Sequence, residues 1–248
     1  MTQKISLTLN IWRQKTTSSQ GKFENYQLSN LSEDLSLLEV LDQLNEDLIR
    51  NSQRPVNFDH DCREGICGSC GFLINGQAHG PLIAATACQL YLRHITNGEV
   101  LTLEPWRAKA FPIIQDLTVD RSSLDRLIAS GGFYSINTGD APDADNIKID
   151  QGSAFSAFET ATCIGCGACV ASCRNSSASL FVAAKLAHLG QLPQGETERG
   201  KRIEKMKEQI SKEAFGNCSN QLECEAVCPK QISADWISWM NKENSFIT

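Results

Sequence analysis

The sequence predicts an α+β protein with two domains: residues 1–115, in which strands surround one helix, and residues 116–248, which are all helical. Apolar and polar side chains alternate in several short segments of the first part, which is typical of half-buried strands. Segments of the second part follow helical spacing instead. The eleven cysteines also form two sets with different spacing, and one set lies in each part.

The first part has the element order of a small α+β roll. Residues 5–12 alternate apolar and polar side chains and predict a strand, and residues 22–28 could pair with it as a hairpin. Residues 36–51 open with a Ser-x-x-Glu capping box and predict a helix with an apolar face. Asn75-Gly76 predicts a tight type I′ hairpin, and residues 100–104 alternate again as a closing strand.

The second part follows a linker, residues 111–120. Helices are expected over residues 124–130, 178–189, 196–215 and 232–241. Gly216 follows the third of these helices, at a position where a helix C-terminus favours glycine. Residues 131–153 are rich in Gly, Asn, Asp and Ser and have little apolar periodicity, so we expect a surface loop there.

Charge and composition narrow the class of protein. The net charge of −6 argues against nucleic-acid binding, which needs a basic surface. The N-terminus lacks the apolar core of a signal peptide, and no apolar run approaches the roughly eighteen residues that span a membrane. Without export, metal binding explains eleven cysteines better than disulfides do. We therefore expect a cytoplasmic metalloprotein.

The first cysteine set has the spacing C-x4-C-x2-C followed by a distant cysteine. Its members are Cys62, Cys67, Cys70 and Cys88. This is the spacing of plant-type [2Fe–2S] proteins. Gly65, Gly68 and Gly71 supply the small or positive-φ positions that a chain needs to wrap closely around a cluster. A structural zinc site is the alternative, but zinc sites usually pair cysteines in two separated short elements.

The second set opens with C-x2-C-x2-C-x3-C, the bacterial-ferredoxin spacing. In that pattern the first three thiolates bind one cluster and the fourth binds another. A second run of cysteines lies far downstream and should repeat the arrangement by pseudo-symmetry. Each cluster is therefore expected to take ligands from both runs. The predicted [4Fe–4S] ligands are Cys163, Cys166, Cys169 and Cys228. The predicted ligands of the other cluster are Cys173, Cys218 and Cys224.

Gln221 stands where the downstream run would need its middle cysteine. Glutamine is a poor iron ligand beside thiolates, because soft sulfur donors are the ones that select iron–sulfur clusters. Three thiolates without a fourth predict a [3Fe–4S] cluster at this site. These assignments use all eleven cysteines and leave none for a disulfide or a catalytic thiol.

These motifs resemble the iron–sulfur (B) subunit of succinate dehydrogenase and fumarate reductase. The resemblance covers nearly the whole chain. It rests on the three-cluster cysteine set and on the segments Cys62-Arg-Glu-Gly-Ile-Cys-Gly-Ser-Cys70, Phe111-Pro-Ile-Ile-Gln-Asp-Leu117 and Cys228-Pro-Lys230. It implies a plant-type ferredoxin domain of β-grasp fold followed by an all-α bacterial-ferredoxin-like domain. It also implies a wire of clusters in the order [2Fe–2S], [4Fe–4S], [3Fe–4S].

The resemblance implies an electron-transfer subunit of a membrane-bound succinate:quinone oxidoreductase, between an FAD-containing flavoprotein subunit and quinone in a membrane anchor. The first cluster would lie nearest the flavin and the third nearest the quinone. Arg174, Ala178 and Ser219 replace a proline, a tryptophan and a histidine of many members, so the quinone contacts are not carried over. These departures point to the branch with a haem-binding cytochrome b anchor, often linked to menaquinone. The implied location is the cytoplasmic face of the bacterial inner membrane.

No catalytic residue is expected on this chain, because it has no glycine fingerprint for a dinucleotide and no paired acid and base. The dicarboxylate chemistry would occur on the partner's flavin, and succinate oxidation and fumarate reduction are both open. Two alternatives remain. One is the iron–sulfur subunit of another flavoprotein reductase complex, of the thiol-linked fumarate reductase or heterodisulfide type. The other is a non-redox zinc-binding interaction module.

Overall fold

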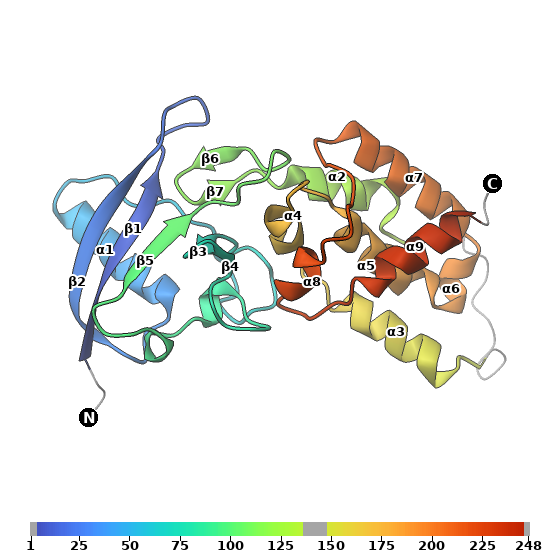
Figure 1. Ribbon diagram of the computed structural model, residues 1–248, viewed down its shortest axis with the longest axis horizontal. Coiled ribbons are helices and arrows are strands. Elements are labelled where there is room, and N and C mark those ends of the chain that lie inside the picture. Colours follow the sequence, from blue (N-terminus) through green and yellow to red (C-terminus); the bar gives the residue numbers. More distant parts are fainter. Residues whose placement is uncertain (1–3, 136–147, 246–248) are drawn as a thin grey trace.

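The computed structural model describes residues 4–135 and 148–245 of the chain. Figure 1 shows two parts side by side along the longest axis, a sheet with one helix at one end and a group of helices at the other. The predicted α+β class is confirmed, and every described element from residue 122 onward is a helix. Of the helices that the structure describes, none has the length and apolar character needed to span a membrane.

A five-stranded sheet, in the order β2-β1-β5-β3-β4, forms the N-terminal part. The strands are β1 (Lys4–Arg13), β2 (Lys22–Ser32), β3 (Leu73–Ile74), β4 (Gln77–Ala78) and β5 (Val100–Glu104). β1 pairs antiparallel with β2 and parallel with β5, so the first and last strands are neighbours at the centre. β3 and β4 form the predicted hairpin around Asn75-Gly76. This mixed sheet agrees with the expected β-grasp fold.

Helix α1 (Leu37–Arg50) begins at the predicted capping box. The Ser36 backbone N–H donates to the Glu39 carboxylate (2.7 Å), and the Glu39 N–H donates to the Ser36 hydroxyl (3.3 Å). Two N–H groups that the helix itself cannot satisfy are thereby paired. The apolar face of α1 then packs on alternate side chains of β1. This core includes Leu37, Leu41, Leu44, Leu48, Ile5, Leu7, Leu9 and Ile11.

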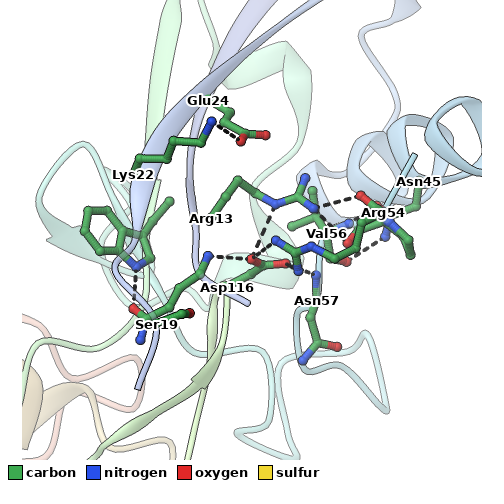
Figure 2. Close-up of polar contacts among 12 residues, drawn as sticks. Arg13, Ser19, Lys22, Glu24, Asn45, Arg54, Val56, Asn57 and Asp116 are labelled. Carbon is green, nitrogen blue, oxygen red and sulfur yellow. Dashed lines mark hydrogen bonds and ion pairs between the residues drawn. The ribbon is translucent and has the colours of Figure 1, made fainter. Parts of the chain in front are cut away.

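Buried Asp116 joins three segments at the edge of this sheet (Figure 2). Its carboxylate is fully buried and accepts two hydrogen bonds from the Arg54 guanidinium (2.8 and 2.9 Å). It also accepts the backbone N–H groups of Gln14 (2.8 Å) and Asn57 (3.0 Å), and Arg13 Nε lies 3.4 Å away. Asp116 lies in the turn between β6 (Ile113–Gln115) and β7 (Thr118–Val119). The carboxylate therefore ties this hairpin to the end of β1 and to the loop after α1.

The C-terminal part is a group of helices around α5, which is buried along most of its length (Figure 1). The helices are α2 (Ser122–Gly131), α3 (Gln151–Ala161), α4 (Ala168–Ser172), α5 (Ser179–Gly190), α6 (Pro193–Glu196), α7 (Arg199–Lys212), α8 (Glu223–Ala226) and α9 (Asp235–Ser245). The N-terminal part also contains two 3-10 turns between β4 and β5, η1 (Ala87–Gln89) and η2 (Leu92–His94).

The helix expected over residues 196–215 is present as α7, but its bounds are wrong. It begins at Arg199, after the separate short helix α6, and ends at Lys212 because Glu213 is extended (φ −91°, ψ 170°). Gly216 therefore does not cap a helix. A Cβ on Gly216 would overlap the carbonyl oxygen of Asn175, so glycine is needed there for close packing against another segment.

The expected surface loop at 131–153 is also too long. Residues 136–147 lie outside the described residues, and α3 already begins at Gln151. Asp150 caps this helix, since its carboxylate accepts the Ser153 N–H (2.9 Å). The two phenylalanines of α3, Phe155 and Phe158, are exposed.

The linker between the two parts contributes side chains to both hydrophobic cores. Leu117 packs in the core of the sheet and α1. Trp106 and Phe111 precede it in sequence but pack in the core of the helices. The chain between β5 and α2 therefore contributes to both cores and holds the two parts together.

Candidate metal-cluster sites

The first group of thiols lies in an irregular loop and in the 3-10 turn η1. Cys70 and Cys88 are buried, whereas Cys62 and Cys67 are half-buried. Cys70 interacts electrostatically with Cys88 and Cys67, and Cys62 interacts with Cys67, so the four thiols form one group. Two glycines of the loop, Gly65 and Gly68, have a φ of +72°, a conformation that other residues rarely adopt.

Hydrogen-bond donors favour the thiolate form of two members of this group, Cys62 and Cys88, whereas the Cys88 thiol and burial raise the pKa of Cys70. The Glu64 N–H donates to Cys62 Sγ (3.3 Å), and the backbone N–H of Glu64 lowers the pKa of Cys62. The Thr86 hydroxyl lies 3.1 Å from Cys88 Sγ. The Cys70 thiol, followed by the Thr86 hydroxyl, lowers the pKa of Cys88. Metal ligation requires the thiolate, so these contacts prepare the loop for a metal.

The second group of thiols lines one small cavity of about 30 Å³ between α4, α5 and the segment after α8. Its cysteines are Cys163, Cys166, Cys169 and Cys228. Apolar side chains line the rest, among them Leu180, Phe181 and Ile232. Burial raises the pKa of Cys166 to about 12 and raises the pKa values of Cys163 and Cys169 as well. A positively charged centre is therefore needed before these thiols ionise.

The third group lines a separate small cavity of about 10 Å³ next to the N-terminus of α5. Cys173, Cys218 and Cys224 lie there, and Gln221 lines the same cavity. Burial raises the pKa of Cys224 to about 11, whereas Cys218 is exposed. The structure thus brings together each set of cysteines that the spacing had grouped.

The three groups follow one another in space. The loop of the first group touches the loop of the second, because a Cβ on Gly68 would overlap the carbonyl oxygen of Ile164. Leu180 lines both the second cavity and the third. The second group is therefore the middle one.

The donor sets fit iron–sulfur clusters. Each set consists of soft sulfur donors, which select such clusters. The second cavity is lined mainly by thiols and apolar side chains, whereas serine and amide side chains also line the third. Within the described residues, no three His, Cys, Asp or Glu side chains converge on one point closely enough for a single metal ion. A cluster spaces its ligands further apart, because several iron and sulfide atoms lie between the thiols.

The sequence did not reveal the residues that join the first loop to the second. Arg121 and Trp106 both donate hydrogen bonds to the carbonyl oxygen of Cys166 (3.2 and 3.1 Å). Buried His79 packs edge-on against Trp106, with ring centroids 5.3 Å apart. None of these residues belongs to a cysteine motif, and their roles depend on contacts between residues far apart in the chain. No signal in a single sequence identifies them.

Comparisons with known proteins agree with this arrangement. Residues 8–126 match the family model of the 2Fe-2S iron-sulfur cluster binding domain, and residues 159–232 match that of the 4Fe-4S dicluster domain. The chain is 26% identical over 247 residues to the succinate dehydrogenase iron-sulfur subunit of Bacillus subtilis, covering 94% of this chain and 89% of the relative. It is 31% identical over 172 residues to the fumarate reductase iron-sulfur subunit of Wolinella succinogenes, covering 67% and 66%.

A solved structure has the same fold. The chain superposes on a chain of the Mycobacterium smegmatis Sdh1 complex in the apo form with a TM-score of 0.67 and 17% identity. The match covers 98% of this chain and 97% of the other. The family models confirm a 2Fe-2S domain followed by a 4Fe-4S dicluster domain, and this likeness confirms the fold over nearly the whole chain.

Proposed function

Since the chain belongs to the family of iron–sulfur subunits of succinate dehydrogenase and fumarate reductase, we propose that it carries electrons between flavoprotein and quinone in a membrane-bound succinate:quinone oxidoreductase. A member of this family is the electron-transfer subunit of an oxidoreductase complex, with [2Fe–2S], [4Fe–4S] and [3Fe–4S] clusters as its cofactors. The dicarboxylate chemistry takes place on the flavoprotein subunit.

The observation that supports this function best is the row of three thiol groups with both outer groups at the surface. Ile66 in the first loop is 59% exposed, and Leu222 beside the third cavity is 50% exposed. Cys166 in the middle group is 6% exposed. Iron–sulfur clusters, when bound, supply one-electron chemistry at potentials that depend on charge, hydrogen bonds and exposure. A wire needs this geometry, because electrons enter and leave at its ends and the middle must be insulated.

All eleven thiols serve as ligands in this proposal. Cys62, Cys67, Cys70 and Cys88 hold the [2Fe–2S] cluster. Cys163, Cys166, Cys169 and Cys228 hold the [4Fe–4S] cluster, and Cys173, Cys218 and Cys224 hold the [3Fe–4S] cluster. Gln221 lines the third cavity without offering sulfur, which supports three iron atoms there rather than four.

The other residues of the sites hydrogen-bond the cysteine ligands and shield the clusters from solvent. Backbone N–H groups donate to sulfur at Cys62, Cys67 and Cys228 over 3.3 to 3.5 Å. Such hydrogen bonds stabilise the more negative, reduced state of a cluster and so raise its potential. Leu180 and Phe181 form an apolar wall of the middle cavity. Such a wall limits the contact of the middle site with water and with solvent oxidants.

The partners follow from the two exposed ends. An FAD-containing flavoprotein subunit would cover the first loop, and a membrane anchor with quinone would cover the third cavity. Ala178 is completely buried and Arg174 is exposed, so quinone contacts at this end come from residues other than Ala178. We propose a haem-binding cytochrome b anchor with menaquinone as the quinone, and a peripheral position on the cytoplasmic face of the bacterial inner membrane. The boundary between the two ferredoxin-like domains is proposed to lie between residues 115 and 116.

Low-temperature EPR of the anaerobically purified complex, with iron and zinc analysis, tests this function. We expect a near-isotropic oxidised signal just above g = 2. Dithionite should bleach it and produce a rhombic [2Fe–2S] signal. Iron should approach about nine atoms per chain, the sum over the three clusters.

Three other outcomes separate the alternatives. High iron without the oxidised signal would mean that the third site holds a cubane and that the Gln221 argument is wrong. Bound zinc without any signal would instead indicate the zinc-binding interaction module. Iron–sulfur signals that succinate fails to reduce and fumarate fails to oxidise in the complex would point to another flavoprotein reductase.

A further inference from the structure

The first two cysteine loops meet without any room between them. A Cβ on Gly68 would overlap the carbonyl oxygen of Ile164 and lie 3.0 Å from the backbone nitrogen of Cys166. The backbone of the first loop therefore touches the backbone of the second directly. Gly68 is needed for this approach as well as for its φ of +72°.

Trp106 fills the space beside this contact. The indole is 1% exposed and lies between two glycines, each of which directly follows a cysteine of the two loops. A Cβ on Gly71 would lie 2.7 Å from the indole, and one on Gly167 would lie 3.6 Å from Nε1. Nε1 donates to the carbonyl oxygen of Cys166 (3.1 Å), so the ring packs on one loop and hydrogen-bonds the other.

Arg121 holds both loops at once. Its Nη1 donates to the carbonyl oxygens of Gly68 (2.5 Å) and Cys166 (3.2 Å), and its Nη2 donates to that of Ser69 (3.4 Å). The planar guanidinium offers several donors in a fixed geometry, which an ammonium group cannot match. Arg121 lies two residues after the end of the β6–β7 hairpin that Asp116 anchors, so the N-terminal part determines its backbone position.

We propose that Gly68 and Arg121 are positioning residues that set the approach of the first two cluster sites. Gly68 allows backbone contact between the loops, and Arg121 clamps them and places one positive charge beside both sites. This role rests on the proposed function, because an electron leaving one site must reach the next. The rate of electron transfer falls steeply with distance, so a widened junction slows passage. The cation also favours the reduced, more negative state of both sites.

The test uses the anaerobically purified complex with variants Gly68→Ala and Arg121→Gln. Gly76→Ala is the matched control for the first, because Gly76 has a similar φ of +77° but nothing within 4 Å of an added Cβ. Arg93→Gln controls for the loss of a cation, since Arg93 is half-exposed and pairs with Asp34 at 3.6 Å. The readouts are microwave power saturation of the reduced [2Fe–2S] signal and the midpoint potentials of the first two clusters.

We expect Gly68→Ala to keep its iron but to lose relaxation enhancement from the neighbouring reduced cluster, so that its [2Fe–2S] signal saturates at lower power. Arg121→Gln should show the same loss and, in addition, lower both midpoint potentials. Both controls should behave as the wild type. If Gly68→Ala loses its [2Fe–2S] signal altogether, Arg121→Gln tests the positioning role by itself.

The positioning role is overturned if the wild type has its three cluster signals while Arg121→Gln keeps both wild-type saturation and wild-type potentials. The proposed function fails in a different way, through absence of the cluster signals in the wild type itself. The two failures are therefore distinct in a single set of spectra.

Discussion

Replacing Asp116 by asparagine should destabilise the protein strongly, because it removes the charge from a buried hub. The wild-type carboxylate accepts four hydrogen bonds, from Arg54 (twice), Gln14 and Asn57. An asparagine has one oxygen to accept them, and its amide group would face other donors. Arg54 is 35% exposed in its side chain and can turn to water, but the side chain of Arg13 is 4% exposed and cannot.

These contacts allow the loss in free energy of unfolding to be estimated. Breaking a buried ion pair by removing one partner costs about 3–5 kcal/mol. For a chain of this size, each kcal/mol lowers the melting temperature by about 2–4 °C, so Asp116→Asn should melt about 6–20 °C below wild type. Thermal unfolding followed by circular dichroism measures this, with the visible spectrum showing that the clusters are intact at the start.

Asp34→Asn is the matched control for this change. Asp34 is 56% exposed in its side chain and lies 3.6 Å from Arg93. Exposed pairs of this kind contribute about 0–1 kcal/mol, so the control should melt close to wild type. If Asp116→Asn melts as close to wild type as Asp34→Asn does, the hub does not hold the β6–β7 hairpin in the way inferred from its hydrogen bonds.

Three further predictions concern other parts of the chain. Gln221→Cys should supply the missing thiolate and add one iron, so that iron analysis rises by about one atom per chain and the oxidised EPR signal disappears; an unchanged signal would refute the role given to Gln221. Ser36→Ala should cost about 1 kcal/mol through loss of the α1 cap, measured as a lower urea midpoint, whereas exposed Ser18→Ala should have no effect. Burial and the Glu24 hydrogen bond raise the pKa of Tyr26 to about 12. Stability should therefore fall as pH rises from about 10 to 12, since the unfolded chain ionises first, and Tyr26→Phe should remove that part of the loss.

The sequence alone determined the parts whose information is local. The alternating residues of β1, the capping box of α1 and the Asn75-Gly76 hairpin each depend on neighbours a few positions away, and all three are present in the structure. The spacing of the cysteines also grouped the thiols as the cavities do, because the pattern of each short run indicates which thiols share a cluster with the distant run. The short helix α6 (Pro193–Glu196) escaped prediction, because it contains a proline and a glycine, the two poorest helix formers.

Only the tertiary structure decided how the two parts meet. Arg121 and Gly68 are 53 residues apart, and Trp106 and Cys166 are 60 apart. Asp116 reaches back 102 residues to Gln14. Contacts of this kind leave no periodic pattern, because each needs only one suitable side chain at one place in space. The sequence therefore determined which thiols belong together, and the folded chain determined how closely the groups approach one another.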